Sequence, residues 1–218
     1  MSIIDRTMPM DDIQYYFQNS DRLDSVVKLW EYLDSMGFMS APASSQNSHH
    51  NAFEGGLFHH SCNVVDNLFA LYKAGGFGRT SYQEDSLLLV GLFHDAGKCT
   101  DGFGDVNYLP NVLKSGKVSD AKPYEVNKSI LKISSAYRSV LIVSHFVPLY
   151  EDEMQAIAHH DYLWVPEGKC LQVSDVCPLT LMLHFADMWA GIYEEPVESL
   201  LNSVENRNLT YFCDEIDN

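Results

Sequence analysis

The chain of 218 residues carries 14 basic and 30 acidic side chains, a formal net charge of −16, and is 46% hydrophobic. This composition is ordinary for a globular protein large enough to bury one core, so we expect a single domain over residues 1–218. No stretch approaches the roughly 18 consecutive apolar residues of a membrane span, and the acidic charge disfavours a nucleic-acid binder, which needs basic residues to displace counterions.

The N-terminus and the cysteines bear on the compartment. The opening MSIIDRTMPMDDIQ lacks the basic patch and apolar stretch of a secretory signal, so we expect a cytoplasmic protein. The five cysteines (62, 99, 170, 177 and 213) are odd in number, and no two have CxxC spacing. We therefore expect free thiols and neither a disulfide frame nor a zinc knuckle.

Apolar residues at helical spacing predict a mostly α-helical chain of the all-α class. A polar loop over residues 40–56 separates the first two helices. Ser81 is a candidate N-cap for the third helix. The expected helices cover residues 20–38, 57–76, 81–98, 128–146, 150–160 and 177–193.

A long connection follows the third expected helix. Residues 100–127 are irregular and rich in Gly, Pro, Asn and Asp. Connections of this length in compact domains are often binding loops or lids. The tail, residues 206–218, is compatible with either a strand or a docked extension.

The stretch GLFHDAGK, residues 91–98, ends an apolar segment with an adjacent histidine and aspartate, His94 and Asp95. An ionised carboxylate in low dielectric is costly unless it is paired or bound to a metal. EGGLFHH, ending at His60, and the lone Asp187 of LMLHFADMWAG add an imidazole and a carboxylate. Two imidazoles and two carboxylates suit one divalent ion such as Mn, Fe, Co, Ni, Zn or Mg.

Each of these pieces alone also has a structural explanation. A His-Asp pair can be a capped or hydrogen-bonded pair, an Asp in an apolar helix can pair with Arg or Lys, and a double histidine can lie on the surface. Adjacent ligands on one helix point about 100° apart, so the others must come from other helices, as in bundle-core metal sites. The order and setting of the pieces favour a metal site.

GGLFHHS, GLFHDAGK and LHFADMWAG together resemble the H…HD…D signature of the HD-domain metal-dependent phosphohydrolase superfamily. The resemblance covers about residues 50–192 and leaves an N-terminal helix and a C-terminal tail as extensions. It implies an HD-domain helical bundle with a long irregular insertion after the HD helix. It also implies metal ligands at His60, His94, Asp95 and Asp187, with His94 and Asp95 serving catalysis.

A second metal stays an alternative. Some HD proteins add two histidines for it, and AIAHHD offers His159 and His160. At the position where those proteins have the other histidine, this chain has Ser135, and His145 lies elsewhere on the same expected helix. A single ion is therefore favoured.

Further residues are candidates for binding substrate, transferring a proton or supporting the metal ligands. Lys98 lies at i+4 from His94 and can face a phosphate on the same side of the helix. Alternatively, its positive charge can interact favourably with the negative C-terminal end of the helix dipole. His160 or His159 can orient a leaving group, donate a proton or bind substrate, and Arg138 can contact phosphate or lie on a solvated face. His184 lies three residues before Asp187, supporting it or simply filling the core. Tyr108, Tyr124 and Trp164 are candidates to stack on a base.

The resemblance implies hydrolysis of a phosphate ester or anhydride of a nucleotide by metal-activated water. Nucleotidase, deoxynucleoside triphosphate hydrolase and cyclic-nucleotide phosphodiesterase types all stay open. The alternatives are a 3′–5′ exonuclease on single-stranded RNA or DNA and a catalytically degenerate, nucleotide-binding regulatory HD domain. We expect a small phosphorylated partner, no membrane and no nucleic acid, and the apolar stretches are compatible with a homo-oligomer.

Overall fold

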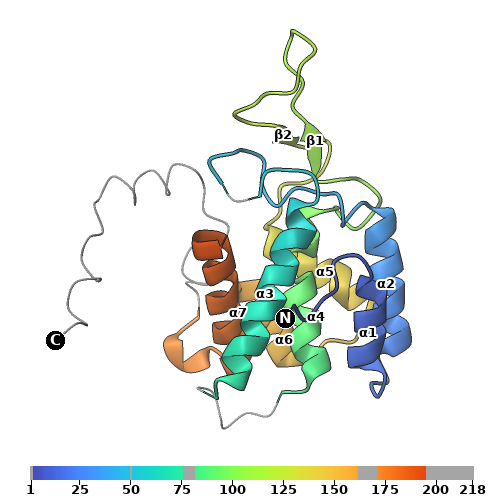
Figure 1. Ribbon diagram of the computed structural model, residues 1–218, viewed down its shortest axis with the longest axis vertical. Helices are drawn as coiled ribbons and strands as arrows, with labels where there is room; N and C mark the ends of the chain where they lie inside the picture. Colours follow the sequence, from blue (N-terminus) through green and yellow to red (C-terminus); the bar gives the residue numbers. More distant parts are fainter. Residues whose placement is uncertain (1, 50, 76–81, 162–170, 195–218) are drawn as a thin grey trace, which may run out of the picture.

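The structure is a computed structural model that describes residues 2–49, 51–75, 82–161 and 171–194. Across these ranges it contains seven α-helices and one two-stranded hairpin (Figure 1), so the mostly helical prediction is confirmed. The helices are α1 (Pro9–Phe17), α2 (Leu23–Ser35), α3 (Gly56–Lys73), α4 (Glu84–Phe93), α5 (Ser135–Phe146), α6 (Glu151–His159) and α7 (Pro178–Trp189).

Helix α4 lies inside the bundle. Every residue from Ser86 to Phe93 is buried, which is the pattern of a helix that is apolar all round and surrounded by protein. It contacts α1, α3, α6 and α7, while α3 and α6 each also pack on α7. The core therefore surrounds α4, and polar side chains at its two ends lie in low dielectric.

Helix α1 was not expected from the sequence. It begins with Pro9, which suits the first turn of a helix because the missing N–H would have no partner there. Its Ile13 and Phe17 are fully buried, and it packs on α2 and α4. Only nine residues long, the helix offers too few turns for the apolar period of Ile13 and Phe17 to stand out.

The expected helix over residues 81–98 is shorter in the structure. Ser81 lies outside the described residues, α4 ends at Phe93, and a 3₁₀ turn, η1 (Ala96–Lys98), follows Asp95. Gly97 permits this turn to approach α5, since a Cβ there would collide with the Ser135 carbonyl and with Arg138. The Gly97 N–H donates to Ser139 Oγ at 2.9 Å, which fixes the turn on α5.

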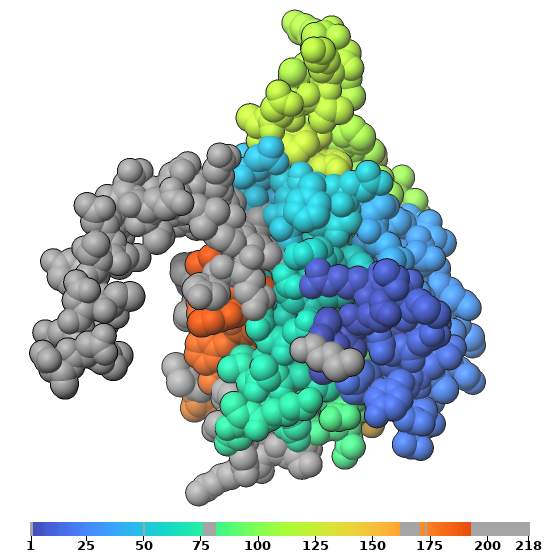
Figure 2. Space-filling view, in the orientation of Figure 1, coloured from blue at the N-terminus to red at the C-terminus, as the bar shows by residue number. Residues whose placement is uncertain are grey.

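The long connection contains a small antiparallel hairpin, β1 (Tyr108–Pro110) and β2 (Tyr124–Val126). The prediction of irregular chain thus missed two short strands, because three-residue strands leave no alternating pattern long enough to detect. The hairpin projects from one end of the bundle (Figures 1 and 2). Its base is held by Tyr124 N–H donating to the Ser45 carbonyl at 3.2 Å.

No helix in the described part of the chain is long and apolar enough to cross a membrane. The expected tail element over residues 206–218 and Trp164 lie outside the described ranges.

Candidate metal centre

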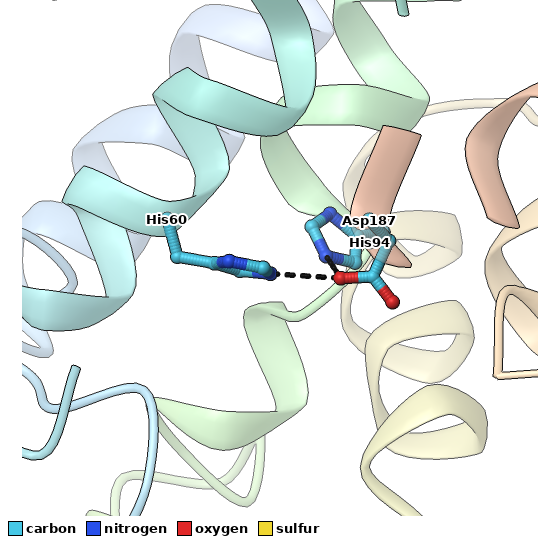
Figure 3. A group of neighbouring side chains, drawn as sticks. All are labelled: His60, His94 and Asp187. Atoms are coloured by element: carbon cyan, nitrogen blue, oxygen red, sulfur yellow. Dashed lines mark ion pairs between the residues drawn. The ribbon is translucent and has the colours of Figure 1, made fainter. Parts of the chain in front are cut away.

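Three helices deliver the predicted metal ligands to one place. His60 lies in the second turn of α3, His94 and Asp95 directly follow α4, and Asp187 lies near the end of α7. Figure 3 shows the His60 and His94 rings converging on the Asp187 carboxylate. His60, His94 and Asp95 are at most 1% exposed, so the cluster is buried.

The distances within the cluster are short. His60 Nε2 lies 2.9 Å from Asp187 Oδ1 and 3.8 Å from Asp95 Oδ2. His94 Nε2 lies 3.4 Å from Asp95 Oδ2 and 3.8 Å from Asp187 Oδ1. Four side chains from three parts of the sequence therefore present nitrogen and oxygen atoms to a common point.

Backbone carbonyls orient two of the imidazoles. His94 Nδ1 donates to the Gly91 carbonyl and His160 Nδ1 donates to the Ile157 carbonyl, both at 2.9 Å. Because a carbonyl only accepts, Nδ1 holds the proton and Nε2 is the atom turned to the cluster. Histidines that bind metals usually have their other ring nitrogen fixed in this way.

The residues fit a divalent metal ion. The ligand atoms of His60, His94 and Asp187 lie within 4.8 Å of one another, as do those of His94, Asp95 and His160. His94 Nε2 and both Asp95 carboxylate oxygens are buried, and their polar neighbours are Lys98 and the other side chains of the cluster. Buried nitrogen and oxygen atoms that face one another in this way are the arrangement that a metal ion can bridge. Imidazole with carboxylate suits Zn, Fe, Ni and Mn.

Lys98 is paired with Asp95. Its Nζ lies 2.6 Å from Asp95 Oδ2, and its side chain is 20% exposed. The i+4 relation to His94 expected from a continuous helix does not describe this contact. The chain here is a 3₁₀ turn, in which residues three apart lie above one another, so Lys98 meets Asp95.

Burial and neighbouring charges set the protonation of the cluster. Burial opposes charge on His94, but Asp95 and Asp187 outweigh it and raise the pKa of His94 to about 10. Burial also opposes charge on Asp95, yet Lys98 and His94 hold the Asp95 pKa well below its usual value. The Asp187 pKa is likewise lowered, against burial, by hydrogen bonds from His60 and His94. Both carboxylates are therefore ionised at neutral pH.

His160, and not His159, enters the cluster. His160 follows α6, is 1% exposed, and its Nε2 lies 3.5 Å from Asp95 Oδ1. The His159 ring instead lies against Tyr137 of α5, with ring centroids 6.3 Å apart. His184 Nδ1 donates to the His160 carbonyl at 2.7 Å, so it supports the end of α6.

Asp161 is a candidate ligand that the sequence reading missed. Its Oδ2 lies 3.6 Å from His160 Nε2, and a ligand atom of Asp161 also lies within 4.8 Å of those of His160 and Asp187. The sequence AHHD could have indicated this ligand, because its carboxylate directly follows the two histidines.

Arg138 lies outside the cluster and is 4% exposed. Its guanidinium donates to Asn107 Oδ1 at 3.1 Å and to the Leu131 carbonyl at 2.7 Å, which ties the long connection and the segment before α5 to that helix. His145 is exposed in the last turn of α5. Ser135 begins α5 and packs against Gly97.

Comparison with protein-family models, curated proteins and solved structures gave no match to this chain. What the structure shows is a helical protein with a buried His/Asp cluster able to hold a metal ion.

Proposed function

We propose that the protein is a metal-dependent phosphohydrolase of the HD type that cleaves a phosphate ester or anhydride of a nucleotide. The observation that carries this proposal is the convergence of His60, His94, Asp95 and Asp187 in a buried cluster beside the cation of Lys98. When bound, a divalent ion supplies charge stabilisation for the phosphoryl group and acidifies a water molecule.

The remaining work is assigned to side chains of this chain. His60, His94, Asp95 and Asp187 hold the ion. The Asp95 carboxylate, ionised because of its lowered pKa, accepts a hydrogen bond from the attacking water and orients it. Lys98 Nζ places a positive charge beside the phosphoryl oxygens, the main need of phosphoryl transfer.

His160 is the candidate proton donor. Burial opposes its charge, but Asp161 and Asp95 outweigh burial and raise the pKa of His160, which favours the protonated ring that a proton donor needs. In hydrolysis the water oxygen bonds to phosphorus and the bond from phosphorus to the leaving oxygen breaks. His160 Nε2 gives its proton to that oxygen, and the proton lost by water restores the donor.

Product analysis by chromatography tests the proposal. The purified chain is incubated with Mn²⁺ and a panel of ribo- and deoxynucleoside mono-, di-, tri- and cyclic phosphates, with Asp95→Ala as the matched control. We expect turnover of at least one member by the wild type and none by the variant. The released phosphate, pyrophosphate or triphosphate identifies the bond that is cleaved.

Other outcomes separate the alternatives. Turnover of single-stranded oligonucleotides alone would favour the exonuclease. A protein that binds metal but hydrolyses neither mononucleotides nor oligonucleotides would contradict the proposal, and one that binds nucleotide without metal would favour the regulatory domain. Equal turnover by Asp95→Ala would show that the His94–Asp95 pair is structural.

A further inference from the structure

The hairpin brings two tyrosines to one face. Tyr108 pairs with Val126, and Pro110 pairs with Tyr124. Residues opposite one another in an antiparallel pair share a face, as do residues two apart on one strand. Tyr108 and Tyr124 are therefore diagonal neighbours, within the reach of aromatic side chains.

These tyrosines line a small pocket beside the candidate metal centre. The pocket has a volume of about 160 Å³, and Lys98 forms part of its wall. Since Lys98 Nζ also contacts Asp95 Oδ2 at 2.6 Å, one lysine side chain separates this pocket from the cluster. The rest of the lining consists of Met36, Gly37, Ser40, Ala41, Pro42, Cys99 and Val106.

Hydrogen bonds hold the tyrosines in place. The Asn107 N–H donates to the Cys99 carbonyl at 2.9 Å, directly before Tyr108. Asn127 Nδ2 donates to the Val106 carbonyl at 3.0 Å, which joins the two arms below the hairpin. Arg138 buries its guanidinium against Asn107 and the Gly97 carbonyl, so α5 fixes η1 and the start of β1 together. These contacts fix the backbone that carries the two tyrosines.

The chemistry of the lining suits a planar polar ring. Both tyrosine side chains are half-buried, and neither phenol makes a hydrogen bond to another described residue. Aromatic faces bind bases by stacking, whatever the base. Phenol hydroxyls both donate and accept, so they match the ring edge of a base.

The volume of the pocket limits the size of the ring that it can hold. Pockets for drug-sized ligands occupy about 300–1,000 Å³, whereas a cavity of about 150 Å³ accommodates a single benzene ring. A pocket of about 160 Å³ therefore matches one six-membered ring more closely than the fused rings of a purine.

We propose that the pocket formed by Tyr108, Tyr124 and Lys98 binds the base of a pyrimidine nucleotide whose phosphate lies at the metal centre. The choice of a nucleotide rests on the proposed function, and the size and lining of the pocket supply the preference for pyrimidine. Lys98 joins the two parts of the site, with its stem along the base pocket and its Nζ toward the phosphate.

Nucleoside binding tests this inference without hydrolysis. The full-length, metal-free chain is titrated with uridine, cytidine, adenosine and guanosine, and binding is measured by saturation-transfer NMR. We expect uridine and cytidine to bind more tightly than the purine nucleosides, with saturation strongest at their base protons. Tyr108→Leu should weaken pyrimidine binding about tenfold, within the range for loss of one base–aromatic contact.

Matched variants make the result specific. Tyr15→Leu is the same substitution at an exposed tyrosine of α1, and it should leave binding unchanged. Tyr124→Leu is the second pocket variant and should also weaken pyrimidine binding, which keeps the test decisive if Tyr108→Leu fails to fold. Equal binding of purines, or pyrimidine binding that survives both pocket substitutions, overturns the inference.

Failure of this inference and failure of the proposed function are distinguishable, because nucleosides carry no phosphate. If the protein binds uridine through the tyrosines but hydrolyses no phosphate ester, the pyrimidine pocket is supported and the proposed phosphohydrolase function is contradicted. If it hydrolyses nucleotides without preferring pyrimidines and binds no nucleoside, only the proposed pyrimidine pocket is contradicted.

Discussion

Helix α4 carries a buried charged cluster at each end, and the two clusters are neutralised in different ways. At its start, Arg22 Nη2 lies 3.0 Å from Asp85 Oδ2 and Arg22 Nη1 lies 2.8 Å from Glu153 Oε2. At its end, Asp95 lies beside His60 and His94, and its Oδ2 contacts Lys98 Nζ at 2.6 Å. Both groups are withdrawn from water. In the first, both carboxylates pair with Arg22, whereas in the second, imidazole nitrogens and carboxylate oxygens lie close enough together to hold a metal ion.

The difference separates structural charge from functional charge. Glu153 accepts both from Arg22 and from the Tyr150 N–H at 2.9 Å, so its lone pairs are used within the chain. Asp95 is held ionised by Lys98 and His94, and Asp187 by His60 and His94, while the two carboxylates raise the pKa of His94 to about 10. A divalent cation bound at this cluster would take the place of the proton on His94.

Removing the arginine at the start of α4 should have the largest effect on stability. Arg22→Met leaves the buried Glu153 without a cation, and breaking a buried pair in this way costs about 3–5 kcal/mol of the free energy of unfolding. Denaturant unfolding measures the loss, and bound Mn²⁺ should stay at the wild-type level in the folded variant.

The double variant Arg22→Met with Glu153→Gln is the control, and it should recover part of the stability because the unpaired charge is gone. A cost below about 1 kcal/mol for Arg22→Met alone would mean that this cluster is not the self-sufficient one.

Lys98→Met should separate catalysis from metal binding at the other cluster. Loss of one charged group that stabilises developing negative charge lowers turnover about 10²–10³-fold. The ligands stay in place, so metal content should be retained when measured by mass spectrometry. Lys128→Met, at a lysine whose side chain is 90% exposed, is the matched control and should keep wild-type turnover. Loss of metal from Lys98→Met would assign the lysine to the metal centre itself.

Added metal should stabilise only through the second cluster. A ligand at 100 times its Kd stabilises a folded protein by about 2.7 kcal/mol, and thermal unfolding with and without Mn²⁺ measures this increment. Wild type and Arg22→Met should gain equally, because Arg22 lies at the other end of α4. Asp187→Asn should gain little, and an equal gain in that variant would place the ion elsewhere.

Metal binding should also release protons, with the smallest effect in this series. The pKa of His94 in the metal-free protein, about 10, exceeds its ordinary 6.5. Its protonation therefore contributes stability that is fully present below pH 6.5 and lost as the pH rises toward 10. A metal needs Nε2 unprotonated, so binding at pH 7 should release about one proton from this ring and strengthen as the pH rises.

Calorimetric titration with Mn²⁺ in two buffers of different ionisation enthalpy measures this release. The two apparent binding enthalpies should differ by the ionisation enthalpy of about one proton. Equal heats in both buffers would contradict a protonated His94.

The two clusters also differ in how far the sequence predicts them. His94 and Asp95 are conspicuous because they end an apolar run, and Asp187 because it interrupts one, so the second cluster can be predicted from local context. Arg22 and Glu153 lie in polar surroundings far apart in the chain, and nothing local indicates that they meet. Ion pairs that depend only on how helices pack cannot be predicted from the local sequence pattern.

Finer features of the second cluster depended on tertiary geometry as well. The choice of His160 over His159 follows from the rotation of α6 against α7, which periodicity over nine residues does not fix. The contact of Lys98 with Asp95 required a 3₁₀ turn where a continuous α-helix was expected. The mostly helical class and the candidate His/Asp cluster were thus accessible from sequence, whereas helix α1, the hairpin and the side-chain partners were not.

Metal content tests the central claim most directly. The wild type and Asp187→Asn are dialysed to equilibrium against Mn²⁺, and bound metal and protein are measured on the same samples. The account predicts at least about one ion per wild-type chain, with most of it lost from a variant that keeps its helical circular dichroism. A folded wild type that binds no ion, or a variant that binds as much as the wild type, would contradict it.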